Sequence, residues 1–388
     1  MAMAFLREDL AQLAAYQSPH VAGEEEIAAP ILDPLDTNES PIDLPEALKA
    51  SLAQQYKEAI AANRYPDGDQ LALKQAVLDY AIASGHISPE SISSANVTLG
   101  NGSDELIRSV IMATCLGQHG SILVASPTFS MYGILAKTLG VTVHDAGRKE
   151  NFEVDIDAAQ QAIEAAHIEE PPVKVVFMVH PNSPTGNALT AQELEWLKQL
   201  PEEILVVVDE AYFEFSGHTT LAEALSRPNW LVTRTFSKAF RLAAHRVGYG
   251  IGHPDVIAAL EKLRLPYNLP SFSQAAAQMA LAHSSDILAQ IPVLTAERDR
   301  LFQALIDHPY LRVWPSDSNF VYARLSDRGL ATLEVNHPSD GLAKMFQLLK
   351  AKGTLIRHTG GGLRISIGTA AENTRTLANI QQALELKP

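Results

Sequence analysis

Cysteine is almost absent from the sequence, in which Cys115 is the single example among 388 residues. One cysteine excludes an internal disulfide, so a reducing compartment, the cytoplasm, is expected. Cys115 lies in the apolar, helical-looking run LIRSVIMATCLG, where a small buried residue is the expected role. The N-terminus lacks the basic start and the long apolar segment of a signal peptide, which agrees with this localisation.

Long apolar runs and an excess of positive charge are missing too. No window approaches the roughly 18 apolar residues that a membrane-spanning helix requires. The formal net charge is -15, and Lys and Arg form no cluster that would follow a phosphate backbone. Neither a membrane nor a nucleic acid is therefore an expected partner, and small molecules are the expected ligands. Because HExxH, paired-cysteine and spaced His and acid motifs are also missing, no metal site is expected. GxSxG and Walker motifs do not occur either.

The middle of the chain alternates short apolar runs with helical patterns. Runs rich in β-branched residues, typical of strands buried on both faces, occupy residues 121–127, 173–181, 203–210 and 229–237. An amphipathic pattern, TAQELEWLKQL, lies between two of them at 190–200. This alternation predicts an α/β fold in which helices flank both sides of a mostly parallel sheet.

The pattern changes after about residue 275, where longer helical segments and two isolated strands, SNFVYARL and LRISIG, follow. We therefore expect a large ligand-binding domain over residues 41–275 and a smaller α+β domain over 276–388. The first 40 residues contribute no strand to the large sheet. They are expected to form an arm that packs with the smaller domain or across it.

Polar side chains follow three of the expected strands directly. Asn182 follows the first strand, Asp209 and Tyr212 follow the second, and Ser237 and Lys238 follow the third. Each alone has an ordinary explanation, as a turn former, a helix cap, a packing residue or a solvated surface amine. Ligands of an open parallel sheet bind beyond the carboxyl ends of its strands, so these groups are expected to converge there.

A set of this kind suits a pyridine aldehyde that carries a phosphate. Lys238 would form a Schiff base with the aldehyde, and a buried Asp209 would keep the ring nitrogen protonated, which makes the ring an electron sink. Asn182 and Tyr212 would donate hydrogen bonds to the phenolate oxygen of the ring. The neutral amine is the nucleophile, so neighbouring cations that lower the pKa of Lys238 would favour this role.

A separate segment offers a binding site for the phosphate. VTLGNGSDELIRSVI reads as a strand, a glycine-containing loop and a helix, so the amides near Gly102 and Ser103 would face an anion. Asp104 suits the first turn of this helix. Ser237 and Arg246 would add a hydroxyl and a bidentate cation. Two alternatives stay open, because the NG dipeptide also suits a hairpin turn and Arg246 also suits a surface ion pair.

Four motifs, HPNSPTGNALT, VVVDEAYFEF, TFSKAFRLAAHRVGY and GLRISIG, occur in this order along the chain. With these motifs the chain resembles the fold type I aminotransferases, which use pyridoxal 5'-phosphate. The similarity extends from REDLAQLAAYQSPH near the N-terminus to LRISIGTAAEN near the C-terminus. It is greatest to the histidinol-phosphate aminotransferases, and it implies a homodimer.

The resemblance implies a role for each matching residue. Lys238 would hold the cofactor and then move protons as base and acid, with Asp209 on the ring nitrogen and Tyr212 on the phenolate oxygen. Phe129 would stack on the ring, and Tyr65 would reach the phosphate from the second subunit. The other residues implied in cofactor binding are Gly102, Ser103, Asp104, Asn182, Ser237 and Arg246. Those implied in substrate binding are Tyr16, Asn38, Asn268, Arg357 and Arg364, with Tyr16 and Arg357 the candidates for a substrate phosphate.

The implied reaction is a ping-pong transamination between L-histidinol phosphate and 2-oxoglutarate. It would give imidazole acetol phosphate and L-glutamate, in a step of histidine biosynthesis. An aromatic or broad-range aminotransferase is the first alternative, and a decarboxylase of phosphate-bearing substrates on the same fold is the second. A cofactor-sensing transcription regulator is not expected, since the chain has neither a spare DNA-binding module nor a basic face.

Overall fold

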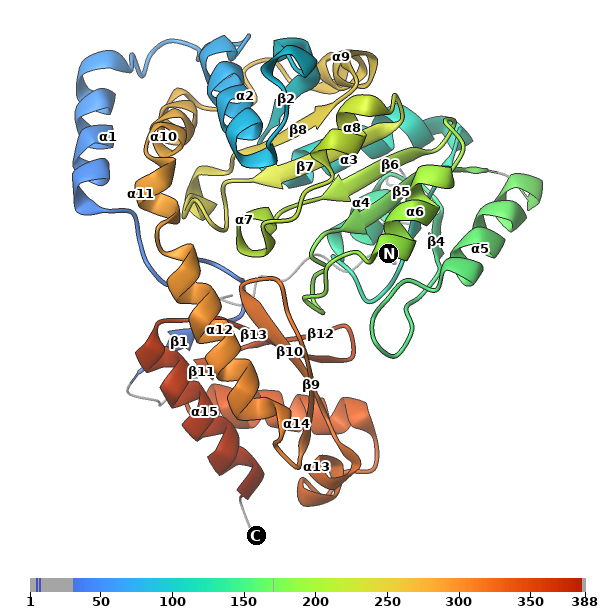
Figure 1. The fold of residues 1–388 in the computed structure, drawn as a ribbon, viewed down its shortest axis with the longest axis vertical. Coiled ribbons are helices and arrows are strands. Elements are labelled where there is room, and N and C mark those ends of the chain that lie inside the picture. Colours follow the sequence, from blue (N-terminus) through green and yellow to red (C-terminus); the bar gives the residue numbers. More distant parts are fainter. Residues whose placement is uncertain (1–4, 6, 8–30, 170, 386–388) are drawn as a thin grey trace.

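The structure is a computed structural model that describes residues 5, 7, 31–169 and 171–385. Two sheets organise it, a seven-stranded sheet in the upper part of Figure 1 and a four-stranded sheet in the lower part. Tyr16 lies outside the described residues, so its expected place in the substrate pocket stays a prediction.

The strands of the larger sheet are mostly parallel. Only the pairings that involve β8 are antiparallel. The α/β fold with a mostly parallel sheet is therefore confirmed. The spatial order is β2 (Val97–Gly100), β8 (Gly248–Gly252), β7 (Trp230–Thr235), β6 (Leu205–Asp209), β5 (Val173–Val179), β3 (Ser121–Val124) and β4 (Val143–Asp145).

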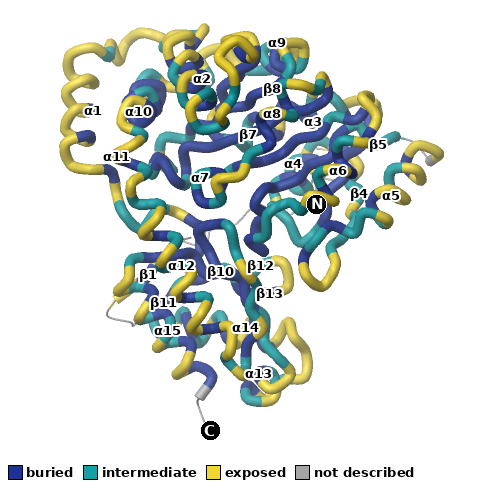
Figure 2. Tube along the Cα trace, in the orientation of Figure 1, coloured by how far each residue is buried: buried dark blue, intermediate teal, exposed yellow. Residues whose placement is uncertain are grey.

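Helices cover both faces of this sheet (Figure 1). On one face, Val206, Val208 and Val232 pack with residues of α2, α6, α8 and α10. On the other face, Val207 and Leu231 pack with residues of α3, α4 and α9. Figure 2 shows the central strands as buried, which agrees with their apolar runs. The helices of this part are α1 (Glu46–Ala59), α2 (Leu71–Gly85), α3 (Ser103–Cys115), α4 (Met131–Thr138), α5 (Ile156–Glu169), α6 (Ala191–Gln199), α7 (Phe213–Ser216), α8 (Leu221–Ser226), α9 (Pro254–Leu263), α10 (Ser271–Ala282) and α11 (Ser284–Leu288).

Local signals in the sequence fix where several helices begin. The Thr190 hydroxyl accepts a hydrogen bond from the Glu193 amide, and the Glu193 carboxylate accepts one from the Thr190 amide. This capping box satisfies two amides that the first turn of α6 leaves without helical partners. α9 has Pro254 at its first position, where a proline has no amide to lose.

The lower part of Figure 1 is built on the four-stranded antiparallel sheet. Its strand order is β12 (Arg357–Thr359), β13 (Gly362–Ser366), β10 (Phe320–Leu325) and β9 (Leu311–Trp314). Leu301, Phe320, Met345 and Ile365 belong to one buried apolar cluster that joins the sheet to its helices. Those helices are α12 (Ile291–Ile306), α13 (Asp327–Thr332), α14 (Pro338–Ala351) and α15 (Ala370–Glu385).

The first described segment of the chain lies against this lower part. β1 (Asp33–Pro34) pairs in parallel with β11 (Thr354–Leu355). The Asp33 carboxylate also accepts a hydrogen bond of 2.6 Å from the Arg375 guanidinium of α15. Residues 36–39 then run toward the larger sheet and line a cavity there. The expected domain boundaries near residues 40 and 275 stay a prediction.

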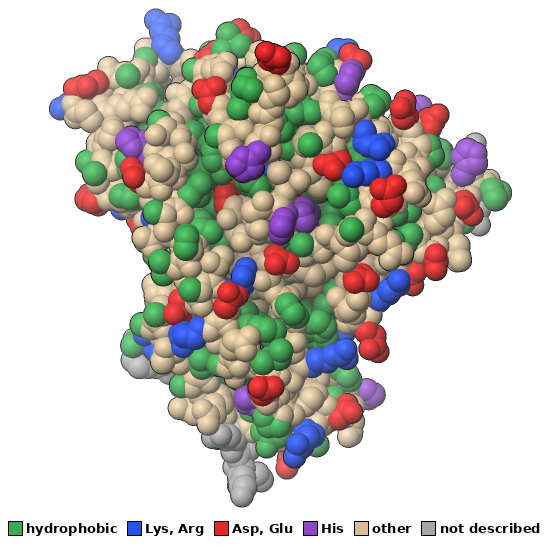
Figure 3. Space-filling view, in the orientation of Figure 1, with side chains coloured by type: hydrophobic (Ala, Val, Ile, Leu, Met, Phe, Trp, Pro, Cys, Tyr) green, Lys and Arg blue, Asp and Glu red, His purple; other side chains and the backbone are tan. Residues whose placement is uncertain are grey.

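Charged side chains are distributed over both parts of the molecule. On the face shown in Figure 3, Lys and Arg lie interspersed with Asp and Glu. Among the described residues, no helix combines the length and the apolar character that crossing a membrane requires.

Candidate active site

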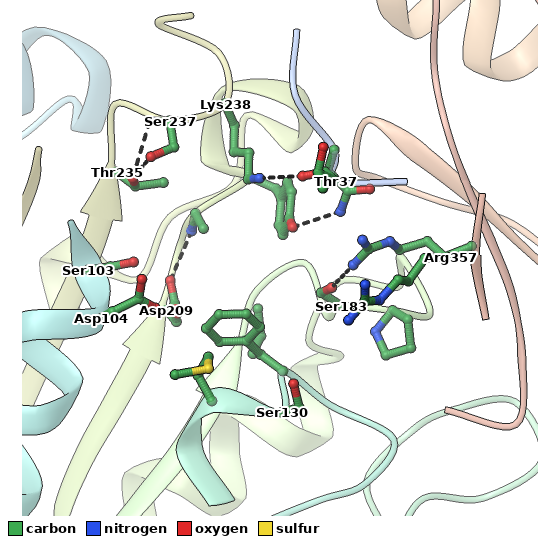
Figure 4. Close-up of a pocket in the computed structure, with 18 of the residues that line it drawn as sticks. Thr37, Ser103, Asp104, Ser130, Ser183, Asp209, Thr235, Ser237, Lys238 and Arg357 are labelled. Atoms are coloured by element: carbon green, nitrogen blue, oxygen red, sulfur yellow. Dashed lines mark hydrogen bonds between the residues drawn. The ribbon is translucent and has the colours of Figure 1, made fainter. Parts of the chain in front are cut away.

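A cavity of about 450 Å³ lies beyond the carboxyl ends of the central strands, between the two sheets. Figure 4 shows how residues from the larger sheet, from the segment that contains Thr37 and from the smaller sheet point into it. The structure thus brings together most of the residues that the sequence singled out. Those that line the cavity are Asn38, Ser103, Asp104, Phe129, Asp209, Tyr212, Ser237, Lys238, Arg246, Arg357 and Arg364.

Lys238 follows β7 after a short turn and is half-buried. Its Nζ donates a hydrogen bond of 2.8 Å to the backbone carbonyl of Thr37 (Figure 4). Burial lowers the pKa of the Lys238 amine, although Tyr212 acts in the opposite direction. An amine with a lowered pKa is neutral more often, and the neutral form is the nucleophile and the base.

Asp209 is the last residue of β6, and its carboxylate is buried at the floor of the cavity. One carboxylate oxygen accepts a hydrogen bond of 2.8 Å from the Tyr132 hydroxyl, and the other accepts one of 3.2 Å from the Ala211 amide. Burial raises the pKa of Asp209 to about 6, because removal from water disfavours the charged form. A cationic group held beside Asp209 would offset that effect.

A compact set of donors lies at the start of α3. The Arg246 guanidinium donates hydrogen bonds of 3.1 Å to the Ser237 hydroxyl and of 3.1 Å to the Asp104 carboxylate. Gly102 precedes the helix with a φ of 74°, and a Cβ atom there would lie 2.5 Å from an Arg246 nitrogen. The positive φ favours glycine at this position, and the absence of a side chain lets the Arg246 guanidinium lie close to the backbone.

A second glycine allows the backbone to come close at the same place. A Cβ atom on Gly248 of β8 would lie 2.5 Å from the amide nitrogen of Ser103, the first residue of α3. The helix start, the Ser237 hydroxyl and the Arg246 guanidinium therefore surround one end of the cavity. Helix N-termini and arginine favour a phosphate, so this arrangement fits the phosphate of the expected cofactor.

Two arginines enter the cavity from the smaller sheet. Arg357 of β12 and Arg364 of β13 are directly opposite partners in the antiparallel ladder. The Arg364 guanidinium donates hydrogen bonds of 3.1 Å to the Ser183 hydroxyl and of 2.7 Å to the Asp36 carbonyl. Their position opposite Lys238 suits the binding of an anionic substrate group beside the amine.

Tyr212 and Asn38 connect the two parts of the molecule. The Asn38 side-chain amide donates a hydrogen bond of 2.9 Å to the Tyr212 hydroxyl, and its carbonyl oxygen accepts one of 2.8 Å from the Ser366 hydroxyl. Asn38 is buried and adopts a φ of 55°. Tyr212 lies just after Asp209, at the start of α7. The Tyr212 hydroxyl is thereby fixed at the wall of the cavity.

Four of the described residues predicted from the sequence do not line the cavity, and one of them, Gly102, directly precedes the lining residue Ser103. Asn182 is buried, and its amide nitrogen donates to the Pro127 carbonyl and the Thr185 hydroxyl, at 3.0 Å and 2.6 Å. Asn268 bonds the Glu105 carboxylate and the Leu99 carbonyl. Tyr65 is 81% exposed. Their predicted ligand contacts are not part of this cavity, and they stay predictions.

Sequence reasoning missed several residues that the structure places at the site. The Tyr132 hydroxyl bonds Asp209, and the Ser183 hydroxyl accepts a hydrogen bond from Arg364. The Thr37 carbonyl accepts one from Lys238. Ser183 lies in the quoted motif HPNSPTGNALT, and Tyr132 lies three residues after the predicted Phe129, so the sequence contains signals near both residues but not their contacts. Among the described residues, no group of three or more His, Cys, Asp or Glu side chains is arranged to hold a metal ion.

Comparison with known proteins places the chain in a class. The model of the family "Aminotransferase class I and II" matches residues 32–380, and the chain belongs to that family. A curated relative named histidinol-phosphate aminotransferase, from Trichodesmium erythraeum, is 56% identical over 97% of this chain and 98% of its own length. Histidinol-phosphate aminotransferase 2 from Nostoc sp. is 54% identical over 99% of this chain and 98% of its own length.

Solved structures share the fold. The crystal structure of histidinol-phosphate aminotransferase from Sinorhizobium meliloti, in complex with pyridoxal-5'-phosphate, has a TM-score of 0.81 to this chain. The match covers 99% of this chain and 98% of that one, with 23% sequence identity. The resemblance to the aminotransferases that the motifs indicated is thus confirmed at the level of both family and fold.

The raised pKa of Asp209 leads to a prediction on cofactor-free protein. The pKa of this carboxyl rises from 3.8 to about 6 on folding, so the folded state holds the proton more tightly than the unfolded state. The free energy of unfolding of the wild type, minus that of Asp209→Asn, should therefore fall by up to about 3 kcal/mol as the pH rises from about 4 to about 6. Urea unfolding across this range measures the difference. Asp255→Asn is the control, because the Asp255 side chain is 93% exposed, and parallel profiles for wild type and Asp209→Asn would contradict the assignment.

Proposed function

We propose that this chain is a pyridoxal-phosphate-dependent aminotransferase that moves an amino group between L-histidinol phosphate and 2-oxoglutarate. The products are imidazole acetol phosphate and L-glutamate, and the reaction serves histidine biosynthesis. The observation that carries the proposal is the single cavity that Lys238, Asp209, Arg357 and Arg364 share. The full-length similarity to relatives named histidinol-phosphate aminotransferase supports the choice of substrate.

The residues of the cavity fit pyridoxal 5'-phosphate. When bound, this group supplies an aldehyde that condenses with amines and a protonated ring that accepts electrons from the substrate carbon. Lys238 is the only lysine among the described residues that line the cavity, so it is the amine that holds the aldehyde. Ser103, Ser237 and Arg246 bind the phosphate, since they surround the end of the cavity at the start of α3.

Asp209 holds the ring nitrogen in its protonated form. The buried carboxylate bonds Tyr132 and the Ala211 amide, which orient it toward the cavity. An adjacent positive charge would favour the ionised carboxylate and offset the burial that raises its pKa. Tyr212 would donate a hydrogen bond to the phenolate oxygen, and Phe129, which also lines the cavity, would pack against the ring. Once released, the Lys238 amine would act as base and then as acid, taking a proton from the substrate carbon that bears the nitrogen and giving it to the carbon on the other side of that nitrogen.

Arg357 and Arg364 bind the anionic ends of the two substrates. Histidinol phosphate presents a phosphate, whereas 2-oxoglutarate presents two carboxylates, so one cavity must accept anions of different shape. Two opposed guanidinium groups can do so, because each offers several donors in a planar array. The hydrogen bonds from Arg364 to Ser183 and Asp36 fix that guanidinium before any substrate arrives.

We further propose that the protein is a cytoplasmic homodimer. Two exposed aromatic pairs support this proposal: Tyr65 stacks on Tyr267 at 4.6 Å, and Tyr56 meets Phe272 edge-on at 5.4 Å. All four rings are at least 36% exposed. Exposed aromatic groups of this size are typical of surfaces that a partner covers. Tyr65 would then reach the phosphate site of the second subunit, and Asn268 follows Tyr267 on the same surface.

Replacing the cofactor lysine gives the first test of this proposal. Lys238→Ala should lose transaminase turnover by at least about a thousandfold, because both the covalent link and the proton carrier are removed. Borohydride reduction followed by peptide mapping should trap pyridoxal phosphate on residue 238 in the wild type and in the control Lys137→Ala. Near-normal turnover by Lys238→Ala would refute the role of this lysine.

The substrate assignment has its own test in Arg357→Ala. The KM for histidinol phosphate should rise about ten- to a hundredfold, the range expected for the loss of a charged hydrogen bond, while the KM for phenylalanine changes little. Steady-state kinetics with both donors measure the contrast. Arg312→Ala, in the same sheet with a side chain 57% exposed, is the control. An equal rise for both donors would favour a broad-range aminotransferase.

The role of Tyr65 across the dimer is tested by mixing subunits. In a hybrid of Tyr65→Ala and Lys238→Ala, the subunit that keeps Lys238 receives an intact Tyr65 from its partner. If Tyr65 acts across the interface, the hybrid should bind pyridoxal phosphate more tightly and turn over faster than the Tyr65→Ala homodimer. Hybrids whose one functional site behaves like that of the Tyr65→Ala homodimer would show that Tyr65 acts within its own subunit or not at all.

A further inference from the structure

A buried ion pair lies directly behind the cavity, on the opposite face of the larger sheet. Successive residues of a strand point to opposite faces. Asp209 and Thr235 line the cavity, so their neighbours Glu210 and Arg234 point to the other side. The flanking valines agree, since Val208 and Val232 belong to the apolar cluster of that other face.

The pair is almost entirely removed from water. The exposed fractions of the Arg234 and Glu210 side chains are 1% and 0%, and an Arg234 nitrogen lies 2.9 Å from a Glu210 oxygen. The guanidinium carbon also lies 3.6 Å from the centre of the Phe213 ring. Removing two charges from water costs about as much free energy as their attraction returns, so a contribution to folding stability does not by itself explain the pair. Its location calls for another explanation.

Glu210 closes the loop that carries Tyr212. One carboxylate oxygen accepts hydrogen bonds from the Thr220 amide at 2.6 Å and from the Thr220 hydroxyl at 3.0 Å. The other oxygen accepts one of 2.8 Å from the Thr219 hydroxyl. The two ends of segment 210–220 are therefore joined by one side chain. Tyr212 lies inside the closed loop, and Asp209 lies just before it.

Arg234 ties this closed loop to the neighbouring strand. Its Nε donates to Glu210 at 2.9 Å, and a terminal nitrogen donates to the Thr219 hydroxyl at 2.7 Å. Arg234 belongs to β7, four residues before Lys238 and three before Ser237. The ion pair thus connects the two chain segments that supply the amine, the carboxylate and the phenol of the cavity, and none of its own atoms lines the cavity.

We propose that Glu210 and Arg234 are positioning residues that fix Asp209 and Tyr212 relative to Ser237 and Lys238. The inference rests on the proposed function, because it assumes that pyridoxal phosphate binds Lys238. Breaking the pair would let the 210–220 loop shift relative to β7. The ring would then lose the alignment of its nitrogen with Asp209 while its aldehyde stays on the lysine.

The decisive variant replaces both charges with apolar residues. Glu210→Leu combined with Arg234→Met removes both charges of the pair. The nearby Glu214 carboxyl, whose pKa burial raises to about 7 and which accepts a hydrogen bond from Tyr80, can remain protonated without Arg234, so folding should be retained. The dissociation constant for pyridoxal phosphate should rise about tenfold, as for the loss of one charged hydrogen bond. The pH midpoint of the visible absorbance of the holoenzyme should shift as well, because that midpoint reports the groups around the bound aldehyde.

A matched control separates positioning from stability. Val206→Ala opens a small cavity in β6 on the same face of the sheet as the pair. It should lower the urea midpoint of the protein but leave both the dissociation constant and the pH midpoint unchanged. A second variant, Thr219→Val, keeps the ion pair and the volume but removes the hydroxyl that bonds both partners. It should raise the dissociation constant by a smaller factor.

The outcomes distinguish this inference from the proposed function. If wild-type protein shows no borohydride-trapped pyridoxal phosphate on Lys238, the proposed function itself fails. If the wild type traps the cofactor but the double variant keeps both its affinity and its pH midpoint, the positioning role is overturned. If the double variant fails to fold, Thr219→Val provides the test. An unchanged dissociation constant for pyridoxal phosphate in that variant would contradict the positioning role.

Discussion

The register of the central strands is the constraint on which the site depends. β5, β6 and β7 pair in parallel, and Asp209 lies level with Val179 on one side and with Thr233 on the other. A shift of one residue in β6 would turn Asp209 away from the cavity and bring Glu210 into it. The apolar residues before them prevent this shift, because Val206 and Val208 pack in one core and Val207 in the other.

Much of the fold and the centre of the site follow from the sequence alone. The apolar runs before Asn182, Asp209 and Lys238 are long enough and rich enough in β-branched residues to identify three buried strands. Parallel strands end at one edge, so the convergence of Asp209 and Lys238 needs no further information. Even so, Asn182 shows the limit of that reasoning, because it reaches the edge and bonds Thr185 instead of lining the cavity.

The remaining features depend on contacts between distant parts of the chain. The segment GYGIG alternates glycine with the buried Tyr249 and Ile251, and it forms β8 because its glycines allow close approach to α3 and to the adjacent strands. Tyr132 bonds Asp209 from 77 positions earlier in the chain, and Asn38 bonds Ser366 from 328 positions away. The sequence around these residues does not indicate which distant residues they contact.

The division of the cavity between two sheets has a consequence for recombination within this family. Lys238 and Asp209 belong to the larger sheet, whereas Arg357 and Arg364 belong to the smaller one, and α12 runs between the two groups in the chain. A chimera with its crossover after α11 would join Lys238 and Asp209 of one parent to the two arginines of the other. Under the proposed function, substrate choice would then be inherited separately from the covalent chemistry, provided that the second parent has a serine at the position of Ser366 to bond Asn38.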